Sequence, residues 1–233
     1  MEITPQVHQV GGMHGNCYVV VRDGLVLIDT GMPENGPKIL SFVRDNLRRD
    51  PSEIHTILLT HFHIDHTGNV AELKNATGAK VAIHEGDAPY LSGEKPMPVP
   101  KKRSLLMRIL RFFVRVTPVK PDIVLHDGDI IAGFTCVHTP GHTPGSTCFH
   151  DPAGKVIFVG DAIVTPGGTI HAPVEEYSAD PAQGRRSLEK IAPLEFEILL
   201  SGHGEPVRPG AAGRVKEFLG RERGGEGRKG RTA

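Results

Sequence analysis

Four side chains that commonly bind metals occur within one short stretch of this chain of 233 residues: His61, His63, Asp65 and His66. They directly follow an apolar run, residues 54–59, that is predicted to be a buried strand, and loops at strand ends commonly carry functional groups. Alternate residues of an extended stretch share one side, so His61, His63 and Asp65 can face a common space. Burying such groups together is costly unless a cation satisfies them. The stretch therefore predicts a metal site.

Three more residues of ligand type lie at comparable places. His142 lies in a loop rich in proline and glycine, Asp161 follows a strand-like apolar run, and His203 follows another. Each has a glycine beside it or one residue away, which allows close approach of backbone. Imidazole and carboxylate ligands suit zinc, iron, manganese or cobalt, and the set offers no thiolate.

This spaced combination resembles the metallo-β-lactamase superfamily, from about residue 10 to about residue 206. The resemblance implies a centre with two metals. One metal would be held by three histidines, His61, His63 and His142. The other would be held by Asp65, His66 and His203. The carboxylate of Asp161 would bridge both.

Hydrolysis is the chemistry that such a centre favours. Two metals about 3.5–4 Å apart can share a hydroxide, lower its pKa toward neutrality and make it the nucleophile. Asp65 can orient the hydroxide or pass a proton to the leaving group, and Asp161 would bridge the two metals. Asp65 and Asp161 are therefore the predicted catalytic residues. Two divalent ions per chain are expected, Zn²⁺ in the first place, with iron, manganese and cobalt as alternatives.

Several other polar residues have candidate roles. Asp29 resembles the family's buried aspartate near the metals and is expected to hydrogen-bond a ligand histidine, the alternative being a turn or cap residue. His84 either lies near the pocket or caps a helix, and His14 could reach the site from an N-terminal loop. The remaining histidines are expected to be structural or at the surface: His8, His55, His126, His138, His150 and His171.

Short strands and helices must position these residues. Strands are predicted over residues 17–21, 25–29, 54–59, 80–83, 123–125, 130–137, 146–150, 155–159 and 196–200. Helices are predicted over residues 36–47, 67–75, 85–91, 181–191 and 214–219. This order gives two similar halves, and the layer arrangement that suits it is an α/β fold of the αββα type, in which two mixed β-sheets pack together with helices outside.

One domain over residues 1–220 is expected, with an insertion at about 96–121 and a disordered tail over 221–233, which is charged and rich in glycine. Part of the insertion, 101–120, carries seven basic and no acidic residues, and its apolar residues fall on one helical face. It could cover a sheet, form a homodimer contact, act as an apolar lid, or bind a membrane surface or nucleic acid.

Composition excludes some classes of protein. The 27 basic and 27 acidic residues cancel, which leaves no overall attraction to nucleic acid or membrane. Apolar runs are too short to span a membrane, and the N-terminus does not resemble a secretory signal. The three cysteines are expected to be reduced core residues, which fits a cytoplasmic protein with a small-molecule substrate.

Two positions narrow the branch of the family. Redox di-iron flavoproteins carry Glu at the position of His63, which argues against that branch. The main group of zinc β-lactamases carries Cys at the position of Asp161, which argues against that group as well. Glyoxalase II proper uses a C-terminal helical domain for glutathione, for which little chain remains here. The hypothesis is therefore a dinuclear hydrolase of small esters, of lactone, thioester or phosphotriester type.

Other activities stay open. A persulfide dioxygenase would bind one non-haem iron through His61, His142 and Asp161. Metal-dependent nuclease or phosphodiesterase activity, and β-lactamase activity as a side reaction, are further alternatives. A binding module without catalysis would be expected to have a degraded ligand set, and this set is complete.

Overall fold

Two mixed β-sheets form the centre of the structure, a computed structural model that describes residues 1–11, 14–96, 98 and 117–229. The strands of the first sheet follow their order in the chain: β1 (Glu2–Thr4), β2 (Val7–Gly11), β3 (Asn16–Val21), β4 (Leu25–Ile28), β5 (Ile54–Leu59), β6 (Lys80–His84) and β7 (Ile123–Leu125). The second sheet has the order β12 (Ile198–Ser201), β11 (Val156–Gly160), β10 (Thr147–Asp151), β9 (Phe134–His138) and β8 (Ile130–Ile131). Pairing from β4 to β7 and between β11 and β12 is parallel, and the other pairs are antiparallel.

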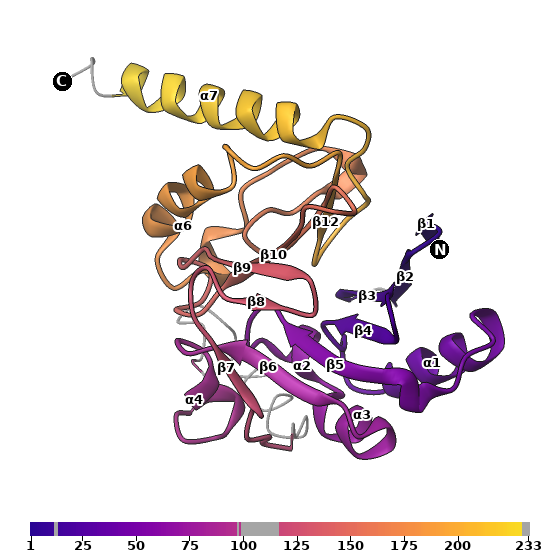
Figure 1. The fold of residues 1–233 in the computed structure, drawn as a ribbon. Coiled ribbons are helices and arrows are strands. Elements are labelled where there is room, and N and C mark those ends of the chain that lie inside the picture. Colours follow the sequence, from indigo (N-terminus) through magenta and orange to yellow (C-terminus); the bar gives the residue numbers. More distant parts are fainter. Residues whose placement is uncertain (12–13, 97, 99–116, 230–233) are drawn as a thin grey trace.

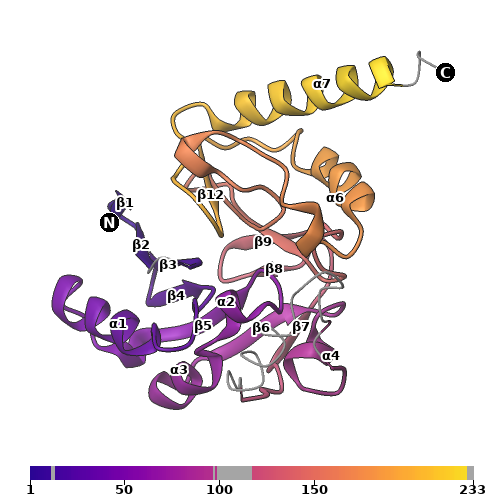
Figure 2. The ribbon, with the colours of Figure 1, turned by 180° about the vertical axis from the view of Figure 1, so that it is seen from behind.

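Helices cover the outer face of each sheet, as Figures 1 and 2 show from opposite sides. The helices that follow strands of the first sheet are α1 (Gly36–Ser41), α2 (Ile64–Thr67), α3 (Val70–Thr77) and α4 (Ala88–Leu91). Those of the second are α6 (Pro181–Ser187) and α7 (Ala211–Lys229). Among the described residues, no helix is both long enough and apolar enough to cross a membrane.

Three apolar clusters fill the spaces between these layers. Alternation along β4 illustrates the cause: Leu25 and Leu27 pack toward α1 and α3, whereas Val26 and Ile28 pack toward the other sheet. A third cluster lies between the second sheet and its helices and includes Phe218 of α7. The predicted αββα sandwich is confirmed.

The topology brings many loops to one edge of the sandwich. Strands β4, β5 and β6 are parallel, so their carboxyl ends share an edge of the first sheet. In the second sheet β9, β11 and β12 run in the same direction, so their carboxyl ends also share an edge. The loops after these strands carry the residues that were predicted to bind metal.

Several predicted elements differ from the observed ones. Residues 130–137, predicted as one strand, form the hairpin β8–β9, because Ala132 and Gly133 adopt positive φ values of 49° and 84° and reverse the chain. The helix predicted over 67–75 corresponds to α3, whereas Thr67 ends the short helix α2. Strands β1 and β2 were not predicted.

Two predicted segments lie at the ends of the described regions. The tail predicted to be disordered from residue 221 is helical as far as Lys229. Helix α7 is anchored by an apolar face formed by Val215, Phe218 and Leu219, and extending a helix that has already formed costs little free energy. Most of the insertion predicted over 96–121 lies outside the described residues. The chain resumes beside α4, where the N–H of Val119 donates to the carbonyl of Leu91 at 2.9 Å.

Candidate metal centre

All seven predicted ligands lie at the shared edge of the two sheets. His61 and His63 lie in the loop after β5, and the first turn of α2 carries Asp65 and His66. The other three come from the second sheet and follow β9, β11 and β12: His142, Asp161 and His203. Segments separated by up to 142 positions in sequence, 61 to 203, therefore meet in one place.

The first ligand group consists of His61, His63 and His142, whose ligand atoms all lie within 4.8 Å of one another. Nε2 of His142 lies 3.0 Å from Nδ1 of His63. His61 and His142 are buried and His63 is partly exposed, so this side of the centre is largely closed to solvent.

The second ligand group consists of Asp65, His66 and His203, whose ligand atoms also lie within 4.8 Å of one another. Nε2 of His203 lies 3.2 Å from Oδ2 of Asp65, and both side chains are partly exposed, by 37% and 26%. This group therefore forms the open side of the centre.

Asp161 lies between the two groups. Its Oδ2 is 3.4 Å from Nε2 of His142 and 3.3 Å from Nε2 of His203. Its Oδ1 is 3.5 Å from Nε2 of His66. A carboxylate in this position can share two cations, although bridging itself stays a prediction.

Within the part of the chain that the structure describes, three buried atoms at the centre have no hydrogen-bond partner: Nε2 of His61, Nε2 of His66 and Oδ1 of Asp161. Leaving a buried polar atom unsatisfied costs about 1–3 kcal/mol. These atoms face a common space, and a cation placed there would satisfy all of them. The residues present thus fit a metal centre.

Outer contacts direct the histidine rings. Asp29 accepts hydrogen bonds from the N–H and the hydroxyl of Thr60 at 2.8 and 2.7 Å, and its Oδ2 lies 2.8 Å from Nδ1 of His66. The hydroxyl of Thr60 also lies 3.1 Å from Nδ1 of His61. In both rings Nδ1 is engaged on the outside, which leaves Nε2 for the centre. The contact expected between Asp29 and a ligand histidine is present.

The electrostatics favour neutral imidazoles in the first group. Burial lowers the pKa of His61 and of His142, and burial together with the ring of His142 lowers the pKa of His63 to about 3. Hydrogen bonds to Asp161 and Asp65 raise the pKa of His203 to about 9. Neutral imidazole is the form that binds metal, so the first group is prepared for binding near neutral pH.

The other candidate histidines lie elsewhere. His84 is buried and stacks on His138, with ring centroids 3.8 Å apart. His14 is exposed. Neither belongs to a group of potential ligands among the described residues.

Two buried polar residues near the centre were not predicted as functional. Asp87 lies after β6, and Asn16 begins β3. Asp87 follows a strand at the same sheet edge as His61, which is the one signal that could have identified it. Asn16 carries no such signal in the sequence.

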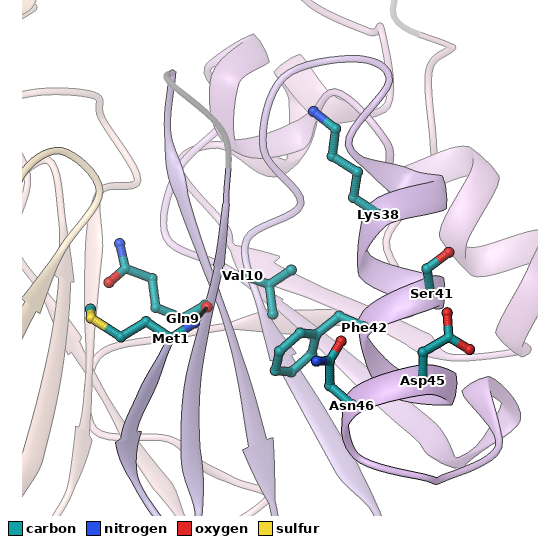
Figure 3. A pocket seen from close by; sticks show the side chains of 8 residues that line it. All are labelled: Met1, Gln9, Val10, Lys38, Ser41, Phe42, Asp45 and Asn46. Atoms are coloured by element: carbon teal, nitrogen blue, oxygen red, sulfur yellow. Dashed lines mark hydrogen bonds between the residues drawn. The ribbon is translucent and has the colours of Figure 1, made fainter.

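A hollow of about 410 Å³ lies apart from this centre. It lies between α1 and the first strands, with Val10 and Phe42 facing each other and Lys38 and Asp45 on the helix side (Figure 3). None of the seven predicted ligands lines it.

Comparisons with known proteins agree with the fold. A family model described as the metallo-beta-lactamase superfamily matches residues 10–203. The probable metallo-hydrolase YflN of Bacillus subtilis is 30% identical over 204 residues, which cover 78% of this chain and 76% of that protein. The acyl-coenzyme A thioesterase MBLAC2 of Bos taurus is 30% identical over 197 residues, with coverage of 76% and 68%.

A similar solved structure is that of TTHA1623 in a di-iron-bound form. It is 31% identical, has a TM-score of 0.68, and the match covers 91% of this chain and 99% of that one. All seven predicted ligands lie within the region that the family model matches.

Proposed function

Because the chain is a metallohydrolase that belongs to the metallo-β-lactamase superfamily, we propose that it hydrolyses small esters, of lactone, thioester or phosphotriester type, at a dinuclear centre. The observation that carries the proposal is the meeting of seven imidazole and carboxylate side chains, three of which have a buried atom without a hydrogen-bond partner among the described residues. Such an arrangement is costly without cations and effective with them.

The two ligand groups would hold one divalent cation each, with Asp161 shared between them. Bound cations would supply a water nucleophile of lowered pKa and positive charge beside the leaving group. Nitrogen and oxygen ligands bind both Zn²⁺ and iron. The similarity to a di-iron structure supports iron as an alternative to zinc.

The open side of the centre would receive the substrate. Asp65 and His203 are its partly exposed residues, whereas His61 and His142 close the other side. Oδ2 of Asp65 can take up a proton from the attacking water and pass it to a leaving group that arrives from solvent. This role makes Asp65 the proposed proton carrier.

Two exposed apolar side chains in the segment that contacts His142 support an acyl substrate. The hydroxyl oxygen of Ser178 lies 3.4 Å from Nδ1 of His142, and Val174 and Tyr177, in the same segment, are 59% and 45% exposed. A relative named as an acyl-coenzyme A thioesterase supports the thioester among the proposed bonds.

A location in the cytoplasm is part of the proposal. Cys17, Cys136 and Cys148 are buried and unpaired, as expected in a reducing compartment. A homodimer through the insertion also stays a proposal, since that segment lies outside the described residues.

The proposal is tested with purified protein whose metal content is measured before and after treatment with a chelator. Lactone, acyl thioester, phosphotriester and cephalosporin substrates are then compared with zinc, manganese or iron restored. We expect two ions per chain and ester hydrolysis that is lost with the metal and regained with it. One iron per chain, with oxygen uptake and sulfite formation from glutathione persulfide, would instead identify the dioxygenase alternative.

A further inference from the structure

We propose that Asp87 and Asn16 are positioning residues that each hold one of the two ligand groups, so that either group can be weakened without the other. The proposal rests on the dinuclear centre proposed above. Neither residue is predicted to bind metal, and each is buried between loops that carry ligands.

The carboxylate of Asp87 is fully buried and accepts three hydrogen bonds. Its Oδ2 accepts from the N–H of Phe62 at 3.0 Å and from the hydroxyl of Thr143 at 2.6 Å. Its Oδ1 accepts from the N–H of Gly145 at 2.6 Å. Asp87 is the residue before α4 and makes no side-chain hydrogen bond to that helix. Its hydrogen bonds thus go to other loops.

The donors to Asp87 lie beside all three members of the first ligand group. Phe62 lies between His61 and His63, and Thr143 directly follows His142. A Cβ atom added at Gly145 would come within 2.5 Å of the backbone nitrogen of Asp87, so the two backbones are in direct contact there. Asp87 therefore joins the loop after β5, in the first sheet, to the loop after β9, in the second.

Asn16 has the corresponding place beside the second ligand group. Its Nδ2 donates to the carbonyls of Ser201 and Gly204 at 3.0 and 2.9 Å, and its N–H donates to the carbonyl of Gly202 at 2.8 Å. These three carbonyls surround His203 in sequence. Asn16 thus holds the His203 loop from both sides.

The residue before Asn16 links this loop to Asp65. Gly15 has a φ of +89°, and a Cβ atom added to it would come within 2.3 Å of the carbonyl oxygen of Asp65. The pair Gly15 and Asn16 therefore contacts the segments of two ligands, Asp65 and His203. These ligands are the ones that form the open side of the centre.

The two sets of contacts are separate. Among the described residues, the side chain of Asp87 makes no hydrogen bond to the loop of His203, and that of Asn16 makes none to the loops of His61 or His142. Asn16 Oδ1 is itself engaged, as it accepts from Nε2 of Gln9 at 2.6 Å. Loss of one positioning residue should therefore loosen one group.

Two isosteric substitutions test this division. Asp87→Asn places an NH2 group against donors that include two backbone N–H groups, and Asn16→Asp places an oxygen against two carbonyls. Each is combined with the loss of a ligand, His203→Ala to leave the first group or His63→Ala to leave the second. The matched control is Asp151→Asn, since Asp151 is also buried and bonded to a backbone N–H, that of Gly154, but pairs with Arg22 instead of a ligand loop.

The measurement is Co²⁺ affinity by competition with a chelator, and it needs no catalytic activity. With His203→Ala we expect Asp87→Asn to weaken binding about 10–100-fold and Asn16→Asp to leave it unchanged. With His63→Ala we expect the reverse, and Asp151→Asn should change neither. Thr143→Val, which removes one of the three bonds of Asp87, should give a smaller loss at the first group and replaces Asp87→Asn if that variant does not fold.

Equal losses at both groups from either variant, or no loss from both, would overturn the proposal. A native protein that binds a single Co²⁺ would instead contradict the dinuclear centre on which it rests. The two failures are therefore distinguishable.

Discussion

Oδ2 of Asp29 lies 2.8 Å from Nδ1 of His66, and both side chains are almost completely buried. Because Asp29 also accepts both donors of Thr60, its carboxylate is held in one orientation. The ring of His66 is thereby turned so that Nε2, which has no hydrogen-bond partner among the described residues, faces the other candidate ligands. A residue outside the set of candidate ligands thus orients the ring of a candidate ligand.

Asp29→Asn should weaken metal binding about 10–100-fold, because the amide can place an NH2 group against the donors of Thr60 or His66. The loss should be measured by competition with a chelator. Asp122→Asn is the control, since Asp122 also accepts a backbone N–H, that of Val81, but at the opposite end of β6. Unchanged affinity in Asp29→Asn would show that the contact does not direct the ring.

Asp161→Ala should lower the content of bound metal and reduce turnover by more than about 100-fold, since loss of an outer partner alone costs 10–100-fold. The reason is that Oδ2 of Asp161 lies within 4.0 Å of Nε2 of three histidines, His61, His142 and His203. Metal analysis and ester hydrolysis measure the effect, with the exposed Asp23→Ala as control. Two retained ions with normal turnover would refute the shared position of Asp161.

His84→Asn should reduce the dependence of stability on acid pH. Burial and the stacked ring of His138 lower the pKa of His84 from 6.5 to about 4. Between these values the unfolded chain binds more protons, so stability is lost as the pH falls from 6.5 toward 4, by up to about 3 kcal/mol.

This effect is measured by urea unfolding of native protein and His84→Asn at pH 7 and pH 4.5. We expect a smaller difference between the two pH values in His84→Asn. His55→Asn, which removes an exposed histidine of β5, controls for the number of histidines. An equal loss in His84→Asn and the native protein would contradict the prediction.

Phe158→Ala should lower the free energy of unfolding by about 3–5 kcal/mol, the usual cost of this truncation in a core. Phe158 is buried between the sheets and packs edge to face on Tyr18 and Phe134, at centroid distances of 5.3 and 5.9 Å. Denaturant unfolding measures the loss. Ile130→Ala, at a side chain that is 78% exposed, should stay within about 0.5 kcal/mol of the native protein.

The sandwich and the seven candidate ligands could be predicted from the sequence because their signals are local. The candidate ligands His142, Asp161 and His203 each follow an apolar run, either directly or within a few residues. Apolar runs indicate strands regardless of which other strands they pair with. His61 and His203 were identified in this way. Local signals failed where short turns decide the outcome, as at Ala132 and Gly133, whose positive φ values divide one predicted strand into a hairpin.

Only the tertiary structure shows which distant residues contact the loops of the candidate ligands. Asp87 bonds Phe62, 25 positions away, and Gly145, 58 positions away, and Asn16 bonds Ser201 across 185 positions. Aspartate and asparagine are frequent in turns, so their type and local context do not distinguish these two residues from others. A hydrogen bond needs atoms about 3 Å apart, and that distance is set by how the two sheets pack. The sequence by itself therefore determined the candidate ligands and the type of chemistry, whereas the packing of the sheets decided how these side chains are positioned.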